Sequence, residues 1–201
     1  LDYGAGNCAS VKSAINKLGL RTRLVKKHDD FKEINLLLIP GVGAFPSAMA
    51  AINKLNLVDS INDYARSGKP IIGVCLGMQL LADCSHELGF TRGLGLIPGV
   101  VEPLKQIDWH IGWNNLEIIS DVSTFGSLNG SCYYFNHSFE FNAANEYIVG
   151  IVRNNFPVVA MVKKDNICGL QFHPEKSQND GLQLLNELII LMVDKKAADN
   201  D

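Results

Sequence analysis

A cysteine between two glycines is the first candidate for chemistry in this chain. Residues 73–77 read Gly-Val-Cys-Leu-Gly and follow an apolar run, Pro-Ile-Ile, at 70–72. A strand that turns sharply into a helix exposes the side chain at the turn, and only small neighbours fit there. A helix that begins after Cys75 would direct its N–H groups and the positive end of its dipole at the sulfur, which favours the thiolate. The pattern predicts a cysteine nucleophile, with an ordinary buried cysteine as the alternative.

A second polar motif could supply a base for that thiol. His173-Pro174-Glu175 follows a strand-like run at 167–172. Proline restricts the residue before it to an extended conformation, so His173 and Glu175, two positions apart, can project to the same side. A carboxylate on one imidazole nitrogen fixes the tautomer, and the other nitrogen can then take the thiol proton. The motif predicts a histidine base oriented by a glutamate, and two solvated residues at a strand end are the alternative.

Six motifs in a fixed order resemble those of class I glutamine amidotransferases, and the resemblance is greatest to the glutaminase subunits of imidazole glycerol phosphate synthases. The match runs almost from end to end of the chain. The motifs are D-Y-G-A-G-N at 2–7, P-G-V-G-A-F at 40–45, C-L-G-M-Q-L at 75–80, G-L-G-L-I-P-G at 93–99, H-I-G-W-N at 110–114 and Q-F-H-P-E-K-S at 171–177. Together they are far more specific than any one of them.

The resemblance implies an enzyme that hydrolyses L-glutamine to glutamate and ammonia through a glutamyl thioester. The implied catalytic triad is Cys75, His173 and Glu175. This chemistry needs no cofactor and no metal ion, because the thiolate, the imidazole and the carboxylate supply the nucleophile, the proton transfers and their orientation.

Two further sets of residues follow from the resemblance. The loop at 40–43 would lie beside the nucleophile, and Gly43 and Leu76 would donate backbone N–H groups to the oxyanion; an ordinary turn after a strand at 36–39 is the alternative. The residues expected around the bound glutamine are Gln79, Glu87, His137, Ser138 and Phe139. The first two would hold the α-amino and α-carboxylate ends of the substrate. The alternative for Gln79 is a glutamine that caps the helix or faces solvent. The alternative for His137 is a structural histidine whose hydrogen bonds are all made within the protein.

Ammonia is mostly ammonium at neutral pH, so a glutaminase of this kind is expected to dock on a synthase that consumes its product. The resemblance implies a heterodimer with a cyclase subunit of the (β/α)8 type, which makes imidazole glycerol phosphate in histidine biosynthesis. The interface residues implied by the family pattern are Asn7, Trp113, Asn114 and Lys176. A large aromatic such as Trp113 is a natural interface anchor, and a core tryptophan is the alternative.

Two departures from the family pattern leave a second partner open. Asp108-Trp109 stands where the family usually has a proline before the motif at 110–114, and Ser177-Gln178-Asn179 replaces the more usual Ser-Gly. Bacterial paralogues with the same glutaminase feed ammonia to sugar-modifying synthases for surface polysaccharides. The glutaminase prediction holds for either partner.

Three other classes of protein share parts of the pattern. The run at 4–9 fits G-x-G-x-x-A, but Lys26-Lys27 stands where a dinucleotide fold needs a ribose-binding acid. An α/β-hydrolase orders its triad as nucleophile, acid and histidine, whereas here the histidine precedes the acid. A non-catalytic binding subunit would show damage in the triad or in the oxyanion glycines, and none is visible.

Composition excludes several other functions. The chain has 201 residues, 47% of them hydrophobic, which is enough for one core and a single domain over 1–201. A net charge of -3 without a basic stripe argues against nucleic acid. No apolar run approaches the roughly 18 residues of a membrane span. Five cysteines with no C-x-x-C spacing and no secretory signal predict free thiols in a cytoplasmic protein without a zinc site.

The elements that must position these residues follow an α/β pattern. We expect a three-layer, open, mostly parallel sheet of the flavodoxin-like type with helices on both faces and antiparallel strands in the second half. We expect residue 1 to fall near the end of the first strand and the start of that strand to be absent from this sequence. In the first half we expect strands at 1–3, 21–25, 36–39 and 70–74, and helices at 10–18, 47–53, 57–67 and 78–82. In the second half we expect strands at 133–135, 147–152, 158–162 and 167–172, a helix at 179–193, and a frayed tail from about 194.

Overall fold

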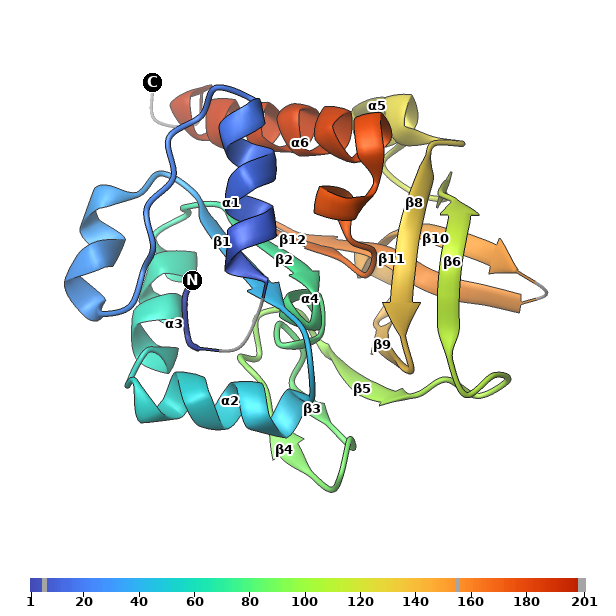
Figure 1. Ribbon diagram of the computed structural model, residues 1–201, viewed down its shortest axis with the longest axis horizontal. Helices are drawn as coiled ribbons and strands as arrows, with labels where there is room; N and C mark the ends of the chain where they lie inside the picture. The colour runs from blue at the N-terminus through green and yellow to red at the C-terminus, as the bar shows by residue number, and fades with distance from the viewer. Residues whose placement is uncertain (5–6, 155, 199–201) are drawn as a thin grey trace.

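The structure is a computed structural model, and it describes residues 1–4, 7–154 and 156–198. Figure 1 shows a central sheet with helices on both sides. The sheet has six strands in the order β1-β2-β12-β11-β10-β7. Its strands are β1 (Leu37–Gly41), β2 (Ile71–Cys75), β7 (Glu117–Ile118), β10 (Ile148–Asn154), β11 (Phe156–Lys164) and β12 (Ile167–Leu170).

The sheet is mixed: two of its five strand pairings are parallel and three are antiparallel. β2 pairs in parallel with β1 on one side and with β12 on the other. From β12 outward, β11, β10 and β7 pair antiparallel. All five residues of β2 are buried, as expected for a central strand that is covered on both faces. The predicted α/β fold with antiparallel strands in its second half is therefore confirmed, as a mixed sheet.

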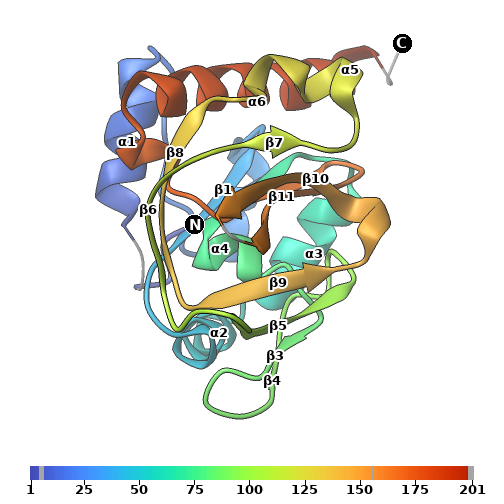
Figure 2. The same ribbon diagram turned by 90° about the vertical axis from the view of Figure 1, so that its right-hand side faces the viewer.

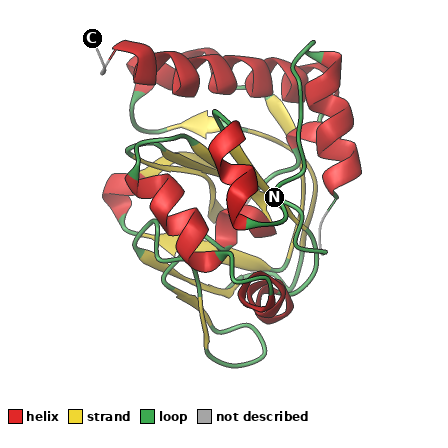
Figure 3. Ribbon diagram, turned by 90° about the vertical axis from the view of Figure 1, so that its left-hand side faces the viewer, coloured by secondary structure: helices red, strands yellow, loops and turns green. Residues whose placement is uncertain are grey.

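The helices divide between the two faces of the sheet. They are α1 (Cys8–Lys17), α2 (Phe45–Lys54), α3 (Val58–Arg66), α4 (Leu76–Gln79), α5 (Val122–Phe125) and α6 (Gln178–Ala198). Ile71 packs with the apolar faces of α2 and α3, whereas its neighbour Ile72 packs with α6. Figures 1 and 3 show the same division, with α1 and α6 apart from α2 and α3. The three-layer arrangement follows from this alternation of buried side chains along β2.

Two smaller sheets are formed by strands between residues 84 and 143. One has the order β4-β3-β5-β9, and in the other β6 pairs antiparallel with β8. Figure 2 shows β6 and β8 along one side of the molecule. The strands are β3 (Cys84–Ser85), β4 (Thr91–Arg92), β5 (Gly99–Pro103), β6 (His110–Asn115), β8 (Cys132–His137) and β9 (Phe139–Ala143). Short 3-10 turns are η1 (His28–Glu33), η2 (Gly126–Leu128), η3 (Asn145–Tyr147) and η4 (Pro174–Lys176).

Two strand predictions near the start of the chain are wrong. Residues 1–3 and 21–25 belong to no strand and form no ladder. One backbone hydrogen bond joins them, from Asp2 N to Val25 O at 2.9 Å, and Leu1 N donates to Leu38 O in β1. These single hydrogen bonds link the two segments to each other and to β1, but a strand of the sheet needs a series of such bonds.

Two helix predictions also need correction. The helix after the cysteine is a single turn, Leu76–Gln79, and does not continue over the expected 78–82. α6 begins at Gln178 and runs to Ala198, so the tail expected to fray from about 194 is helical as far as Ala198, and 199–201 lie outside the described residues. Within the described part of the chain, no helix has the length and apolar content needed to cross a bilayer.

Candidate active site

Cys75 occupies a strained backbone position at the end of β2. Its φ of 55° and ψ of -114° are unusual for a residue with a side chain, and α4 begins at the next residue. The sharp turn from strand to helix that the sequence predicts is therefore present. Cys75 is 6% exposed, so the thiol lies in a largely closed site. The described cysteines are all free thiols.

The glycines on either side of Cys75 are required by close backbone approach. A Cβ on Gly77 would lie 1.7 Å from the carbonyl oxygen of Ile39, and a Cβ on Gly73 would lie 2.5 Å from the carbonyl oxygen of Gly77. Both distances are far below van der Waals contact. The expectation that only small neighbours fit around the turn is confirmed.

His173 and Glu175 form the second part of the site. His173 is extended, with φ -102° and ψ 93°, and η4 begins at Pro174. Its Nδ1 lies 2.9 Å from Glu175 Oε1, and both side chains are buried. The backbone around His173 is fixed by its N–H, which donates to Tyr134 O at 2.9 Å, and by its carbonyl, which accepts from the Ser177 hydroxyl at 2.6 Å. The predicted adjacency of base and carboxylate is confirmed.

The surroundings of His173 make it a strong base. Burial lowers the pKa of His173, but hydrogen bonds to Cys75 and Glu175 outweigh burial and raise the pKa to about 9. An imidazole with a raised pKa accepts a thiol proton more readily than one of ordinary pKa. The second oxygen of Glu175, Oε2, is buried without a hydrogen-bond partner among the described residues. The carboxylate therefore depends on His173 for compensation of its buried charge.

The loop after β1 lies beside the nucleophile. Gly41 and Cys75 are partners in the parallel register of β1 and β2. Gly43, two residues further on, has a φ of 101°, which a residue with a side chain rarely adopts. The Tyr3 hydroxyl supports the loop by donating to Pro40 O at 2.8 Å. The structure thus places the predicted loop next to the cysteine, and the oxyanion roles of Gly43 and Leu76 stay predictions.

A buried hydrogen-bond network leads away from the cysteine. Gln79 Nε2 donates to the carbonyl of Phe139 at 3.0 Å and to Gln171 Oε1 at 3.1 Å. The same carbonyl lies 2.8 Å from His137 Nδ1. Both N–H groups of Gln79 are therefore used within the protein. The contact of Gln79 with bound glutamine stays a prediction. Because both N–H groups of its side chain already donate within the protein, that contact would be made by its side-chain oxygen.

Two histidines continue the network in one direction. His137 Nε2 lies 2.9 Å from His110 Nδ1, and His110 Nε2 lies 3.0 Å from Asn114 Nδ2. Because a carbonyl only accepts, His137 donates to Phe139 from Nδ1 and accepts at Nε2, so His110 donates from Nδ1. Burial lowers the pKa of His137 to about 4 and also lowers the pKa of His110. Both rings are consequently neutral at physiological pH.

Glu87 and Ser138 lie at the edges of this region. The Glu87 carboxylate accepts from Phe45 N at 2.8 Å, at the start of α2. It therefore stabilises the N-terminus of a helix, where a negative charge is favoured. Ser138 joins β8 to β9, and its carbonyl accepts from Leu104 N at 3.0 Å. Contacts of these two residues with the substrate stay predictions.

The predicted interface residues do not all have the same character. Trp113 is 48% exposed on β6, so the alternative of a core tryptophan is wrong. Its ring packs edge-on against Tyr134, and Lys176 Nζ lies 5.8 Å from the centre of the same tyrosine ring. Asn7 caps α1 by accepting from Ser10 N. Asn114 points to His110 and is only partly exposed.

Large apolar side chains continue the exposed face of β6. Trp109 and Ile111 are both exposed and precede Trp113 at alternate positions, so the three share one face of the strand. Tyr134, beneath Trp113, lies next to His173, with ring centres 6.4 Å apart. This apolar face therefore lies close to the triad.

Sequence reasoning missed three residues that the structure places at the site. Gln171 and His110 belong to the hydrogen-bond network, and Tyr3 supports the loop after β1. Gln171 could have been found, because it lies two positions before His173 and so projects to the same side of an extended chain. The other two stand in motifs at 2–7 and 110–114, but nothing in those motifs predicts their contacts with the loop or with His137. Residues 5 and 6 of the first motif lie outside the described residues.

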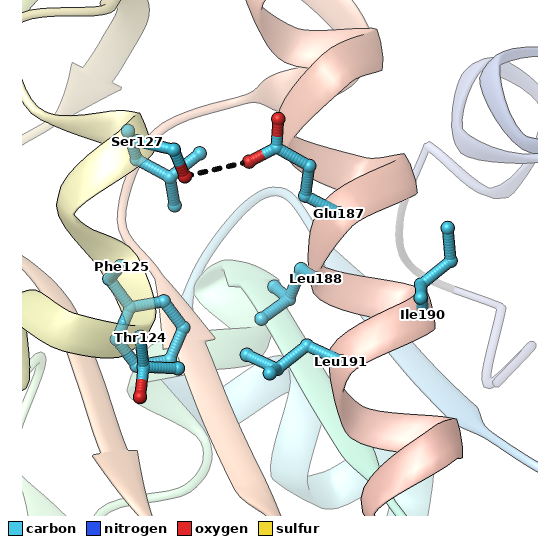
Figure 4. Close-up of a pocket in the computed structure, with 8 residues that line it drawn as sticks. Thr124, Phe125, Ser127, Glu187, Leu188, Ile190 and Leu191 are labelled. Atoms are coloured by element: carbon cyan, nitrogen blue, oxygen red, sulfur yellow. Dashed lines mark hydrogen bonds between the residues drawn. The ribbon is translucent and has the colours of Figure 1, made fainter.

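A separate pocket of about 280 Å³ lies between α5, η2 and α6. Figure 4 shows its lining, in which the Ser127 hydroxyl donates to Glu187 at 3.0 Å. Apart from that pair, the walls are mainly apolar, with Phe125 and Leu191 among them. It contains none of the triad residues, so it is not the candidate active site. Among the described residues no three His, Cys, Asp or Glu side chains gather as a metal site would require.

Comparison with known proteins assigns the family. The model of the family "Glutamine amidotransferase class-I" matches residues 1–191. The chain is 42% identical over 189 residues to the imidazole glycerol phosphate synthase subunit HisH of Listeria innocua, covering 92% of this chain and 91% of the relative. It is 39% identical over 195 residues to the same subunit of Streptococcus mutans, covering 95% and 97% of the two chains.

Solved structures agree on the fold. PurLQS from Thermotoga maritima has a TM-score of 0.76 at 19% identity, with 94% of this chain and 95% of that chain covered. A structure described as a glutamine amidotransferase has a TM-score of 0.74 at 18% identity over similar shares. The strained cysteine, the adjacent His–Glu pair and these matches lead to one conclusion. The chain belongs to the class I glutamine amidotransferase family.

Proposed function

We propose that this chain is the glutaminase subunit of an imidazole glycerol phosphate synthase, which hydrolyses L-glutamine and passes the ammonia to a cyclase subunit. The observation that carries the proposal is the site itself. A cysteine occupies a strained strand-to-helix turn, and a buried carboxylate lies 2.9 Å from the imidazole of the histidine that would take its proton. This is the arrangement that nucleophilic catalysis by a thiol requires.

The proposed reaction has two halves, and in each half His173 takes one proton and gives it up again. His173 takes the proton from the Cys75 thiol, and the sulfur attacks the side-chain amide carbon of glutamine. The C–N bond breaks as the imidazolium gives its proton to the leaving nitrogen, so ammonia departs and a glutamyl thioester remains. His173 then takes a proton from water, which attacks the thioester, and the proton returns to the sulfur as glutamate leaves. Glu175 holds the imidazole in the tautomer that both halves need.

The remaining site residues take their proposed roles from their places around Cys75. Gly43 and Leu76 would donate backbone N–H groups to the oxyanion, since Leu76 follows the cysteine directly at the start of α4 and Gly43 lies two residues after Gly41, the strand partner of Cys75. The residues proposed to contact the bound glutamine are Gln79, Glu87, His137, Ser138 and Phe139. Gln79 and His137 both donate to the carbonyl of Phe139, so three of these five belong to one hydrogen-bond network.

The proposed partner is a cyclase subunit of the (β/α)8 type, in a heterodimer. Relatives at about 40% identity over nine-tenths of the chain carry the subunit name, which favours histidine biosynthesis over a sugar-modifying synthase. The exposed aromatic face of β6 is the proposed docking surface, with Trp113 as its anchor and Lys176 beside it. Asn7 and Asn114 are the other proposed interface residues. The free thiols suit the reducing cytoplasm that we propose as the compartment.

Covalent labelling tests the glutaminase proposal. A glutamine analogue that carries an electrophile at its side-chain carbonyl position should label Cys75 and no other cysteine, and glutamine should protect against labelling. Peptide mass spectrometry would locate the adduct. Labelling of Cys84, which is half-buried outside the site, in preference to Cys75 would contradict the proposal.

A further inference from the structure

Gln171 is a buried amide directed at the nucleophile. It is 0% exposed, and its Nε2 lies 4.0 Å from Cys75 Sγ, at the long end of the range for an N–H donor and a sulfur acceptor. Among the described residues, the Cys75 sulfur is the one acceptor that this nitrogen contacts. A buried amide without an acceptor is costly, so the sulfur is its partner.

The orientation of the amide is forced by its neighbours. The carbonyl of Phe139 can only accept, so Gln79 must turn its NH2 group toward it. The same NH2 group then faces Gln171, which must present its oxygen. The remaining side of the Gln171 amide, its NH2 group, consequently faces Cys75. The backbone cannot turn away either, because Gln171 N donates to Ala160 O at 2.9 Å.

We propose that Gln171 is a positioning residue for the Cys75 thiolate, and that Gln79 holds it in that orientation. The proposal deepens the proposed function, on which it rests for the identity of the nucleophile. An N–H directed at the sulfur stabilises the thiolate more than the thiol, because a hydrogen bond to a charged acceptor is the stronger one. It also restricts where the sulfur lies when the substrate arrives.

Alkylation of Cys75 by iodoacetamide tests this without glutamine. The rate would be measured against pH by peptide mass spectrometry in the full chain and in Gln171→Leu. We expect the midpoint of the profile to move up by about one unit and the rate at pH 7 to fall about tenfold. Gln183→Leu is the matched control, because Gln183 is exposed on α6 and donates only to Glu187. Its profile should match that of the unchanged protein.

A second variant covers the case in which Gln171→Leu does not fold. Gln171→Glu keeps an oxygen facing Gln79 but places a carboxylate, which cannot donate, beside the sulfur. We expect the midpoint to rise at least as far as in Gln171→Leu. Gln79→Met should show a smaller shift of the midpoint in the same direction, since it removes the hydrogen bond that orients Gln171 but leaves the Gln171 amide in place.

The outcomes separate this inference from the proposed function. An unchanged alkylation profile in folded Gln171→Leu, or in Gln171→Glu if the leucine variant does not fold, overturns the positioning role. The profile does not depend on glutamine turnover. A shifted midpoint in a chain that releases no glutamate either alone or with the cyclase subunit would therefore support Gln171 as the positioning residue and count against the glutaminase.

Discussion

Gly41 and Cys75 are direct partners across the parallel strands β1 and β2. The loop that follows β1 therefore starts beside the nucleophile, and its conformation is set by the same strand pairing that positions the thiol. Tyr3 holds the start of this loop through Pro40 O, and Glu87 holds its end through Phe45 N. Three segments far apart in the sequence thus support the loop that carries Gly43.

The Gly43→Ala variant tests the oxyanion role of that loop. Its φ of 101° disfavours any side chain, so alanine should shift the backbone and its N–H. We expect glutamate release to fall about 100-fold in kcat, as for the loss of one oxyanion donor. Gly130→Ala is the control, because Gly130 has a φ of 84° in an exposed turn with equally open space around it. Equal kcat values in the two variants would remove Gly43 from the oxyanion site.

The Cys75→Ala variant tests the nucleophile. In a complex with the synthase partner, we expect it to abolish glutamine-dependent synthesis and to leave ammonia-dependent synthesis unchanged, since alanine removes the thiol and little volume. The measurement is product formation with glutamine and then with ammonium salt. Loss of both activities would mean that Cys75 has a structural role instead.

The Glu175→Gln and His173→Ala variants separate orientation from proton transfer. Glu175→Gln should slow thioester formation less than His173→Ala, for which we expect a loss of about 10³-fold to 10⁴-fold. Without the carboxylate, the pKa of His173 should move down from about 9, which an NMR titration of the ring would show. Undiminished rates in both variants would exclude the triad.

The His137→Gln variant tests the neutral histidine pair through stability. The pKa of His137 is lowered from 6.5 to about 4, chiefly by burial. As the pH falls below 6.5, His137 becomes protonated in the unfolded chain, whereas in the folded chain it stays neutral until about pH 4. His137 therefore contributes stability above pH 6.5 that is lost as the pH falls through this window, by about 3 kcal/mol in total.

Urea unfolding at several pH values measures this effect. The unfolding free energy of the unchanged protein minus that of His137→Gln should be constant above pH 7 and fall between pH 6.5 and pH 4. His86→Gln is the control for loss of a histidine, because His86 is exposed. A pH-independent difference for His137→Gln would show that its ring is not held neutral.

The parallel part of the fold could be predicted because its signals are local. The apolar run of β2, the glycines at 73 and 77 and the proline at 174 each restrict their own segment of backbone. Two other segments, 1–3 and 21–25, have the composition of strands but make single hydrogen bonds instead of ladders. Whether such a segment becomes a strand depends on the neighbouring strands with which it can pair. The sequence of the segment alone does not contain that information.

β6 was missed for a different reason. Its large apolar side chains, Trp109 at its entrance, Ile111 and Trp113, are exposed, whereas His110 is buried on the other side. This reverses the usual alternation, in which apolar side chains face the core. The same reversal makes β6 an unpartnered apolar face, which suits a docking surface.

The candidate site was predictable where its residues are close in sequence. His173 and Glu175 are two positions apart, and the cysteine turn is one continuous motif. The network through Gln79, Phe139 and Gln171 was not predictable, because tertiary packing alone brings these three segments together. Their hydrogen bonds depend on the relative placement of α4, β9 and the end of β12.

Glutamate release from glutamine is the most direct test of the account. The purified chain would be assayed alone and with an imidazole glycerol phosphate synthase cyclase subunit and its nucleotide substrate, with Cys75→Ala as the blank. We predict that the cyclase stimulates release and that Cys75→Ala abolishes it, whatever the rate of the chain alone. Absence of glutamate release above the Cys75→Ala blank in every condition would contradict it.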